Sequence, residues 1–137
     1  MGIVLDSSIL IGLERRGGTV PTAWMQQEVG LAAMTAAELL AGLHRADPSR
    51  RARRAAFVEG ILAVIPTLAF DLAAARLYAQ VEADLASAGT PIGDHADLEI
   101  AATALARGWA VATLNRSDFA RVPGLVLLGP ENLENWG

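Results

Sequence analysis

Short, uninterrupted apolar runs alternate with longer stretches of helical periodicity along the chain, and this alternation limits the possible folds more than any other feature. Short apolar runs bounded by turn residues are typical of strands that are buried on both faces of a parallel sheet. The runs predict strands at 2–5, 31–34, 64–65, 110–114 and 125–128. The intervening stretches predict helices at 7–15, 21–28, 35–45, 49–63, 71–88, 94–107 and 115–120. The pattern indicates an α/β fold: a mainly parallel central sheet of about five short strands with helices on both faces.

The length and composition set further bounds on the class of protein. The 137 residues predict a single domain over 1–137. Hydrophobic residues make up 53% of the chain and charged residues 19%, which is the opposite of a disordered composition. Because the chain contains no cysteine, disulfide frameworks, zinc-thiolate sites and thiol nucleophiles are excluded. With neither a signal-peptide pattern nor an apolar run long enough to span a bilayer, we expect a soluble, cytoplasmic protein.

The charged residues are unusual, because all eleven basic residues are arginines and none is a lysine. The absence of lysine excludes Schiff-base chemistry, a Walker-type phosphate site and a lysine nucleophile. The net charge of −4 argues against binding of nucleic acids by bulk electrostatics alone.

Four carboxylates stand beside the predicted carboxyl ends of strands. They are Asp6, Glu38, Asp97 and Asp118. Ligands of open α/β sheets bind outside the carboxyl ends of the strands, so these side chains are expected to converge there. Crowded carboxylates repel one another unless a cation lies among them, and oxygen-only ligand sets favour Mg²⁺ or Mn²⁺. Such a cluster suits metal-assisted cleavage of phosphodiesters.

Each of these acids has a simpler structural interpretation as a helix cap. Asp6 stands where it could cap the helix at 7–15, and Thr35-x-x-Glu38 matches a capping box. Asp94 and Asp97, like Asn115 and Asp118, form looser versions of the same pattern. Carboxylates also favour the positive end of a helix dipole. By spacing alone, either Asp94 or Asp97 could be the metal ligand.

Four motifs resemble those of the PIN-domain family, and of VapC-type toxins in particular. In chain order they are VLDSSILIG, TAAELLAGL, PIGDHADLEIAATALARG and ATLNRSDFARVPGL. Their order and spacing match the family pattern and cover nearly the whole chain. The resemblance implies a metal-dependent endoribonuclease that hydrolyses RNA phosphodiester bonds with Mg²⁺ or Mn²⁺. It also implies a VapB-type antitoxin as a partner, and a homodimer.

The resemblance carries over to particular positions. Asp6 and Asp97 match the primary metal ligands, and Glu38 and Asp118 complete the catalytic acids. Ser8, Thr113 and Asn115 match polar positions that commonly line such a site. The D-L-x-I-A-A context favours Asp97 over Asp94 as the ligand, so Asp94 is interpreted as an N-cap or an outer group.

Other readings remain open at this point. A degenerate PIN-like domain that only binds a partner would carry the same motifs. A receiver-like signalling domain also has an acidic pocket at strand ends, but it requires a lysine there. His95 is interpreted as a solvated residue at a helix start. The arginines at 50, 51, 53 and 54 could contact RNA phosphates or a partner's acidic groups, or form a solvated helix face.

Overall fold

A computed structural model describes residues 1–133, and in it five strands form one all-parallel sheet in the order β3-β2-β1-β4-β5. The strands are β1 (Ile3–Leu5), β2 (Val29–Ala32), β3 (Thr67–Leu68), β4 (Ala110–Ala112) and β5 (Leu127–Leu128). β1 lies at the centre and pairs with β2 on one side and β4 on the other, so the strand that leads into Asp6 is flanked on both sides. The predicted α/β class with a parallel five-stranded sheet is confirmed.

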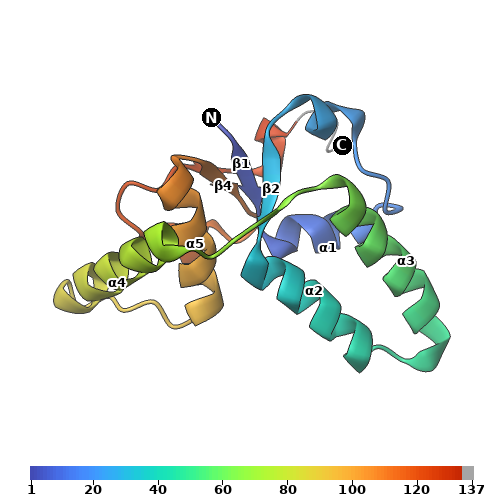
Figure 1. The fold of residues 1–137 in the computed structure, drawn as a ribbon, viewed down its shortest axis with the longest axis horizontal. Coiled ribbons are helices and arrows are strands. Elements are labelled where there is room, and N and C mark those ends of the chain that lie inside the picture. Colours follow the sequence, from blue (N-terminus) through green and yellow to red (C-terminus); the bar gives the residue numbers. More distant parts are fainter. Residues whose placement is uncertain (134–137) are drawn as a thin grey trace.

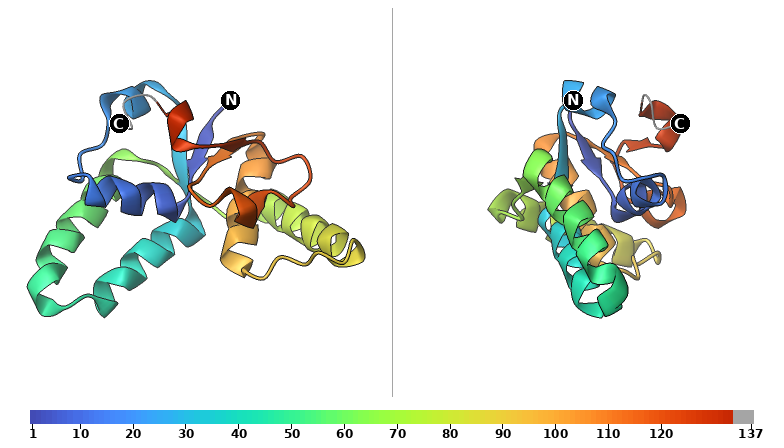
Figure 2. Two further views of the ribbon diagram at one scale, coloured as in Figure 1. Left: turned by 180° about the vertical axis from the view of Figure 1, so that it is seen from behind. Right: turned by 90° about the vertical axis from the view of Figure 1, so that its right-hand side faces the viewer.

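Helices cover both faces of this sheet, as Figures 1 and 2 show. They are α1 (Ser7–Arg15), η1 (Thr22–Gln26), α2 (Ala33–Arg45), α3 (Pro48–Val64), α4 (Leu72–Ser87), α5 (His95–Arg107), α6 (Arg116–Phe119) and η2 (Pro130–Asn132). In Figure 1, α1, α2 and α3 lie together on one side of the molecule, whereas α4 and α5 lie on the other. No helix within residues 1–133 is both long and apolar enough to cross a membrane.

Two hydrophobic cores follow from the alternation of side chains along the strands. Ile3 and Leu5 of β1 pack with residues of α1 and α3 in the first core. Val4, between them, packs on the opposite face with residues of α4 and α5 in the second. Burial on both faces explains why each strand is a continuous apolar run.

Two predicted elements are wrong in position or type. The strand predicted at 64–65 lies instead at 67–68, because α3 continues through Val64 and Ile65 becomes its C-terminal cap. Pro66 disfavours helical backbone at Ile65, and the carbonyl of Pro66 accepts a hydrogen bond from Leu31 as the chain enters the sheet. The helix predicted at 21–28 is only the short 3₁₀ turn η1, since the chain from Val29 onward is needed to pair with β1.

The other elements lie close to their predicted positions, with shifts at the ends. The second strand ends at Ala32 rather than at residue 34, because α2 begins at Ala33. The fourth and fifth strands are shorter than predicted and keep only the residues that pair across the sheet. Gly108 ends α5 in the left-handed conformation (φ 68°) and turns the chain into β4.

Candidate active site

Asp6 is held by hydroxyl groups at the carboxyl end of the central strand. It follows β1 directly, and only 4% of its surface is exposed. Its Oδ2 accepts hydrogen bonds from Ser8 Oγ and Thr113 Oγ1, each at 2.8 Å. Asp6 occupies the N-cap position of α1, but its side chain makes no capping bond, so the simple capping interpretation is wrong.

The two hydroxyl groups are themselves fixed by the backbone that follows β4. Ser8 Oγ accepts from the N–H of Leu114 at 3.0 Å, and Thr113 Oγ1 accepts from the N–H of Asn115 at 2.9 Å. The two oxygens are 3.3 Å apart, but each has its proton committed to Asp6. The ends of β1 and β4 are therefore joined through a single buried carboxylate. Ser8 and Thr113, which were predicted to line the site, do so by donating hydrogen bonds to Asp6.

The start of α5 presents two more aspartates in different roles. Asp94 is the N-cap, and its Oδ1 accepts from the N–H of Ala96 at 2.8 Å, which confirms its interpretation as a cap. Asp97 lies in the first turn of the helix and is half-buried. The side chain of Asp97 makes no hydrogen bond with any residue between 1 and 133. Asp94 thus caps α5, and the Asp97 carboxylate is not used as a helix cap.

The electrostatics show that the predicted acids converge on Asp97. Burial, followed by the negative charges of Asp94, Asp6, Asp118 and Glu38, raises the pKa of Asp97 to about 7. These neighbours come from four different parts of the chain, so the other three predicted acids and Asp94 all lie within electrostatic range of Asp97.

Glu38 reports on the same region from α2. Burial and the charges of Asp6 and Asp94 raise the pKa of Glu38, whereas the Arg45 guanidinium opposes that rise. The side chain lies on the exposed surface of α2 beside the buried Asp6.

The remaining capping interpretations are also tested. α2 begins at Ala33 with Ala32 as its N-cap, so Thr35 is not the cap and the capping box with Glu38 is wrong. Thr35 is fully buried, and its Oγ1 makes no hydrogen bond within residues 1–133. Asn115 is the N-cap of α6 but its side chain makes no capping bond, so the pattern with Asp118 is not a capping box either.

The donor chemistry of this region fits a hard divalent cation. All the candidate ligands are carboxylates, and burial together with the neighbouring negative charges raises the pKa of Asp97, which a nearby cation would oppose. As the side chains stand, no three His, Asp or Glu groups of residues 1–133 are close enough together to chelate an ion. The carboxylates are electrostatic neighbours, and Asp6 is the one held in place by hydrogen bonds.

His95 is tied to the neighbouring helix. It is the first residue of α5, and its Nδ1 lies 2.7 Å from Tyr78 Oη of α4. The two rings stack with centroids 6.5 Å apart. His95 lies at the start of a helix, as predicted, and the contact with Tyr78 was not predicted.

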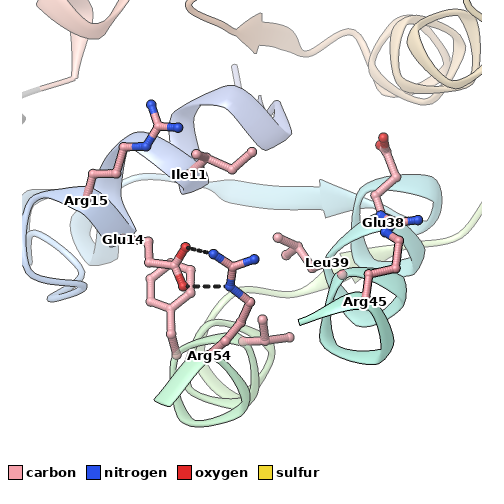
Figure 3. A pocket seen from close by; sticks show the side chains of 10 residues that line it. Ile11, Glu14, Arg15, Glu38, Leu39, Arg45 and Arg54 are labelled. Carbon is pink, nitrogen blue, oxygen red and sulfur yellow. Dashed lines mark hydrogen bonds and ion pairs between the residues drawn. The ribbon is translucent and has the colours of Figure 1, made fainter. Parts of the chain in front are cut away.

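A cavity of about 350 Å³ adjoins the acidic region, with Glu38 in its lining. Figure 3 shows Glu38 and Arg45 of α2 on one side of the cavity and Arg15 of α1 on the other, with Arg54 of α3 between them. Sequence reasoning did not find Arg15, because only the packing of α1 against α2 and α3 brings it to this cavity. It also missed Arg45, although a spacing of seven residues puts Arg45 on the same face of α2 as Glu38. The sequence places Arg54 in the run of arginines at 50, 51, 53 and 54 but gives no sign that it lies in this cavity.

Comparisons with known proteins identify the family and the fold. The family model described as the PIN domain matches residues 3–125. Ribonuclease VapC1 of Rickettsia felis is 36% identical over 131 residues, covering 93% of this chain and 96% of that protein. A tRNA(fMet)-specific endonuclease VapC of Salmonella typhimurium is 34% identical and covers 77% and 74% of the two chains. A crystal structure of DNA-bound VapBC from Salmonella typhimurium superposes with a TM-score of 0.80 at 28% identity, covering 94% and 98%.

Proposed function

The chain belongs to the PIN-domain family, and from this premise we propose that it is a metal-dependent endoribonuclease, the toxin of a VapBC-type pair. The relatives named above are ribonucleases of the VapC type. The proposed reaction is hydrolysis of RNA phosphodiester bonds by the acidic site, with Mg²⁺ or Mn²⁺ bound there.

The observation that carries this proposal is the environment of Asp97. A carboxylate whose pKa is raised to about 7 by burial and by four neighbouring carboxylates is poorly stabilised as an anion. A divalent cation supplies the charge that this arrangement lacks. Asp6 and Asp97 are the proposed ligands, and Glu38 and Asp118 complete the catalytic acids.

The chain's own groups have separable roles in this mechanism. Ser8 and Thr113 fix the orientation of Asp6 through Oδ2, which leaves Oδ1 available to a ligand. Glu38 is suited to accept a proton from the attacking water, because its raised pKa makes it a stronger base than an ordinary carboxylate. When bound, the cation supplies charge neutralisation at the phosphate and at the leaving oxygen.

An RNA cleavage assay tests the proposal directly. The purified chain is expected to cut RNA with Mg²⁺ or Mn²⁺ and to lose that activity in EDTA. An equal rate in EDTA, or no cleavage of any RNA with either metal, would contradict it. The second outcome would favour the alternative, a degenerate PIN-like domain that serves only to bind a partner.

The proposed partners are a VapB-type antitoxin and a second copy of this chain. The structural relative from Salmonella typhimurium is a VapBC complex. Large apolar side chains are exposed at the end of α3 (Val64), the start of α4 (Leu72) and the segment between them (Phe70), as expected of an interface. Light scattering of the isolated chain tests self-association, and a monomer at high concentration would contradict the homodimer.

A further inference from the structure

The arginines of this acidic protein gather along the cleft between α1 and α3. A second cavity of about 640 Å³ adjoins the first, and the two share Glu14, Arg15, Arg54 and Phe57 in their linings. Arg45 lines the first cavity beside Glu38, and Arg50 and Arg53 line the second. Together the cavities form one cleft, which we call the arginine cleft, with an acidic residue of the proposed active site at one end.

Two arginines in this part of the fold already have partners. Arg54 Nε and Nη2 bond the two carboxylate oxygens of Glu14, each at 3.3 Å, as Figure 3 shows. Arg51 donates to the carbonyls of Leu43 and Ala46 at the C-terminus of α2. The pair with Arg54 neutralises Glu14, and the contacts of Arg51 lie outside the linings of both cavities.

The other lining arginines are available to a ligand. The guanidinium groups of Arg15, Arg45, Arg50 and Arg53 make no hydrogen bond or ion pair with any residue between 1 and 133, and all four residues are exposed. Guanidinium groups bind phosphate oxygens in a bidentate manner. With Glu14 neutralised, Glu38 is the one lining acid without such a partner, so the cleft is locally positive within a chain of net charge −4.

We infer that the arginine cleft binds the backbone phosphates of a single RNA strand on one side of the scissile bond and leads the strand to Glu38. This inference rests on the proposed function. An acidic protein with an acidic catalytic site repels a polyanion over most of its surface, so a substrate strand needs a local basic track. The arginine cleft provides one that runs into the site. The ring of Phe57, which lines both cavities, offers an apolar surface for a base.

Continuity with the site favours RNA over an acidic peptide as the occupant. A peptide bound through charge alone would need no particular relation to the catalytic acids. A substrate strand must pass beside them, and the cavity that contains Glu38 also contains Arg15 and Arg45.

Binding and kinetics of Arg50→Gln, Arg53→Gln and the double variant test the inference. Both residues are exposed on α3, and glutamine keeps a good helix propensity, so the fold is expected to survive. The dissociation constant of a labelled single-stranded RNA is measured in EDTA over a range of KCl concentrations. Its logarithmic salt slope is expected to fall by about 0.7 for each arginine removed. In Mg²⁺, KM of the double variant should rise roughly tenfold while kcat stays nearly constant.

The matched control is Arg76→Gln. Arg76 is an exposed arginine on α4 with no described partner, and α4 lies away from α3 in Figure 1. The Arg76→Gln variant loses the same charge as Arg53→Gln but at a position away from the arginine cleft. Its RNA affinity and salt slope should therefore stay close to those of the wild type. An equal loss in Arg53→Gln and Arg76→Gln would mean that net charge alone is responsible, and the inference would be wrong.

Two further outcomes separate this inference from the proposed function. If the wild type cleaves RNA and the double variant keeps its RNA affinity, salt slope and KM, the arginine cleft is not the track although the nuclease function stands. If that double variant keeps its RNA affinity but loses affinity for a polyglutamate peptide, the cleft is a protein-docking surface instead. If the wild type binds RNA through these arginines but cleaves none, the nuclease proposal fails while the cleft remains an RNA-binding surface.

Discussion

The two proposed metal ligands come from different elements of the fold, and their surroundings affect the two carboxylates in opposite ways. Asp6, at the end of β1, is buried and receives two hydroxyl hydrogen bonds. Asp97, at the start of α5, has no hydrogen-bond donor within residues 1–133 and lies among other carboxylates that raise its pKa. The fold therefore orients the Asp6 carboxylate before any cation binds, whereas the ionised Asp97 carboxylate is destabilised until a cation binds.

The largest expected effect is loss of RNA cleavage, and it should be equally large when Asp6 or Asp97 is replaced. Asp6→Asn and Asp97→Asn should each reduce RNA cleavage on the order of 10³-fold, because both remove a proposed ligand. Circular dichroism and cleavage rates measure this. The control is Asp94→Asn, since asparagine caps a helix as well as aspartate does and the Ala96 contact can persist. If Asp94→Asn loses activity and Asp97→Asn does not, the assignment of ligand and cap is reversed.

Mg²⁺ should reveal the difference in stability. A cation that binds only the native state stabilises it by about 2.7 kcal/mol at a hundredfold excess over its dissociation constant. For a chain of this size the melting temperature should rise by roughly 8 °C. Asp97→Asn should remove most of that rise, and thermal melts with Mg²⁺ and with EDTA check it. A melting temperature that falls equally in both conditions would show that Asp97 serves the helix dipole and not a metal.

The pH dependence of the stability of the metal-free protein should report on Asp97 separately from Asp6. The pKa of Asp97 is raised in the folded state from an ordinary value of 3.8 to about 7. The folded chain then binds the proton more tightly than the unfolded chain, so this group contributes stability at low pH that is lost as pH rises through about 7. Because Asp97 is only partly buried, the loss is expected to be roughly 1–2 kcal/mol after screening by solvent.

Urea titrations in EDTA measure this loss as the difference between the wild type and Asp97→Asn. The two proteins should converge below the ordinary pKa of 3.8, separate progressively as pH rises toward 7, and the variant should be the more stable above that pH. A difference that does not vary with pH would contradict the crowding of carboxylates at Asp97.

Local signals predicted one side of the site better than the other. The role of Asp94 as a cap could be predicted, because an N-cap depends on residues adjacent in the chain. The capping box at Thr35 was wrong, because the sheet ends at Ala32 and α2 begins at the next residue. Periodicity also failed at Val64, since a short apolar run fits the end of a helix as well as a strand.

Contacts between distant segments were beyond prediction from local patterns. The hydrogen bonds from Thr113 to Asp6 and from Leu114 to Ser8 join residues more than 100 positions apart, and the pair between Glu14 and Arg54 spans 40 positions. The motifs indicated which side chains meet at the sheet edge. They carried no information about which of those side chains receives hydrogen bonds and which is left among like charges.

The smallest expected effect concerns the hydroxyl that distinguishes the Asp6 side. Ser8→Ala removes a donor to Asp6 Oδ2 and the acceptor of the Leu114 N–H. Thr113 still holds the same oxygen, and water can reach the exposed Leu114, so the free energy of unfolding should fall by only about 1 kcal/mol. Because Asp6 becomes less well oriented, Mn²⁺ affinity should fall about tenfold.

The matched control for Ser8→Ala is Ser117→Ala, an exposed serine on α6 without a described hydrogen bond. Urea titration and Mn²⁺ binding are measured on both variants. If Ser8→Ala lowers stability but leaves Mn²⁺ affinity at the wild-type value, the hydroxyl only supports the sheet edge. The two sides would then be equally unorganised toward the cation, and the contrast between Asp6 and Asp97 would be one of packing alone.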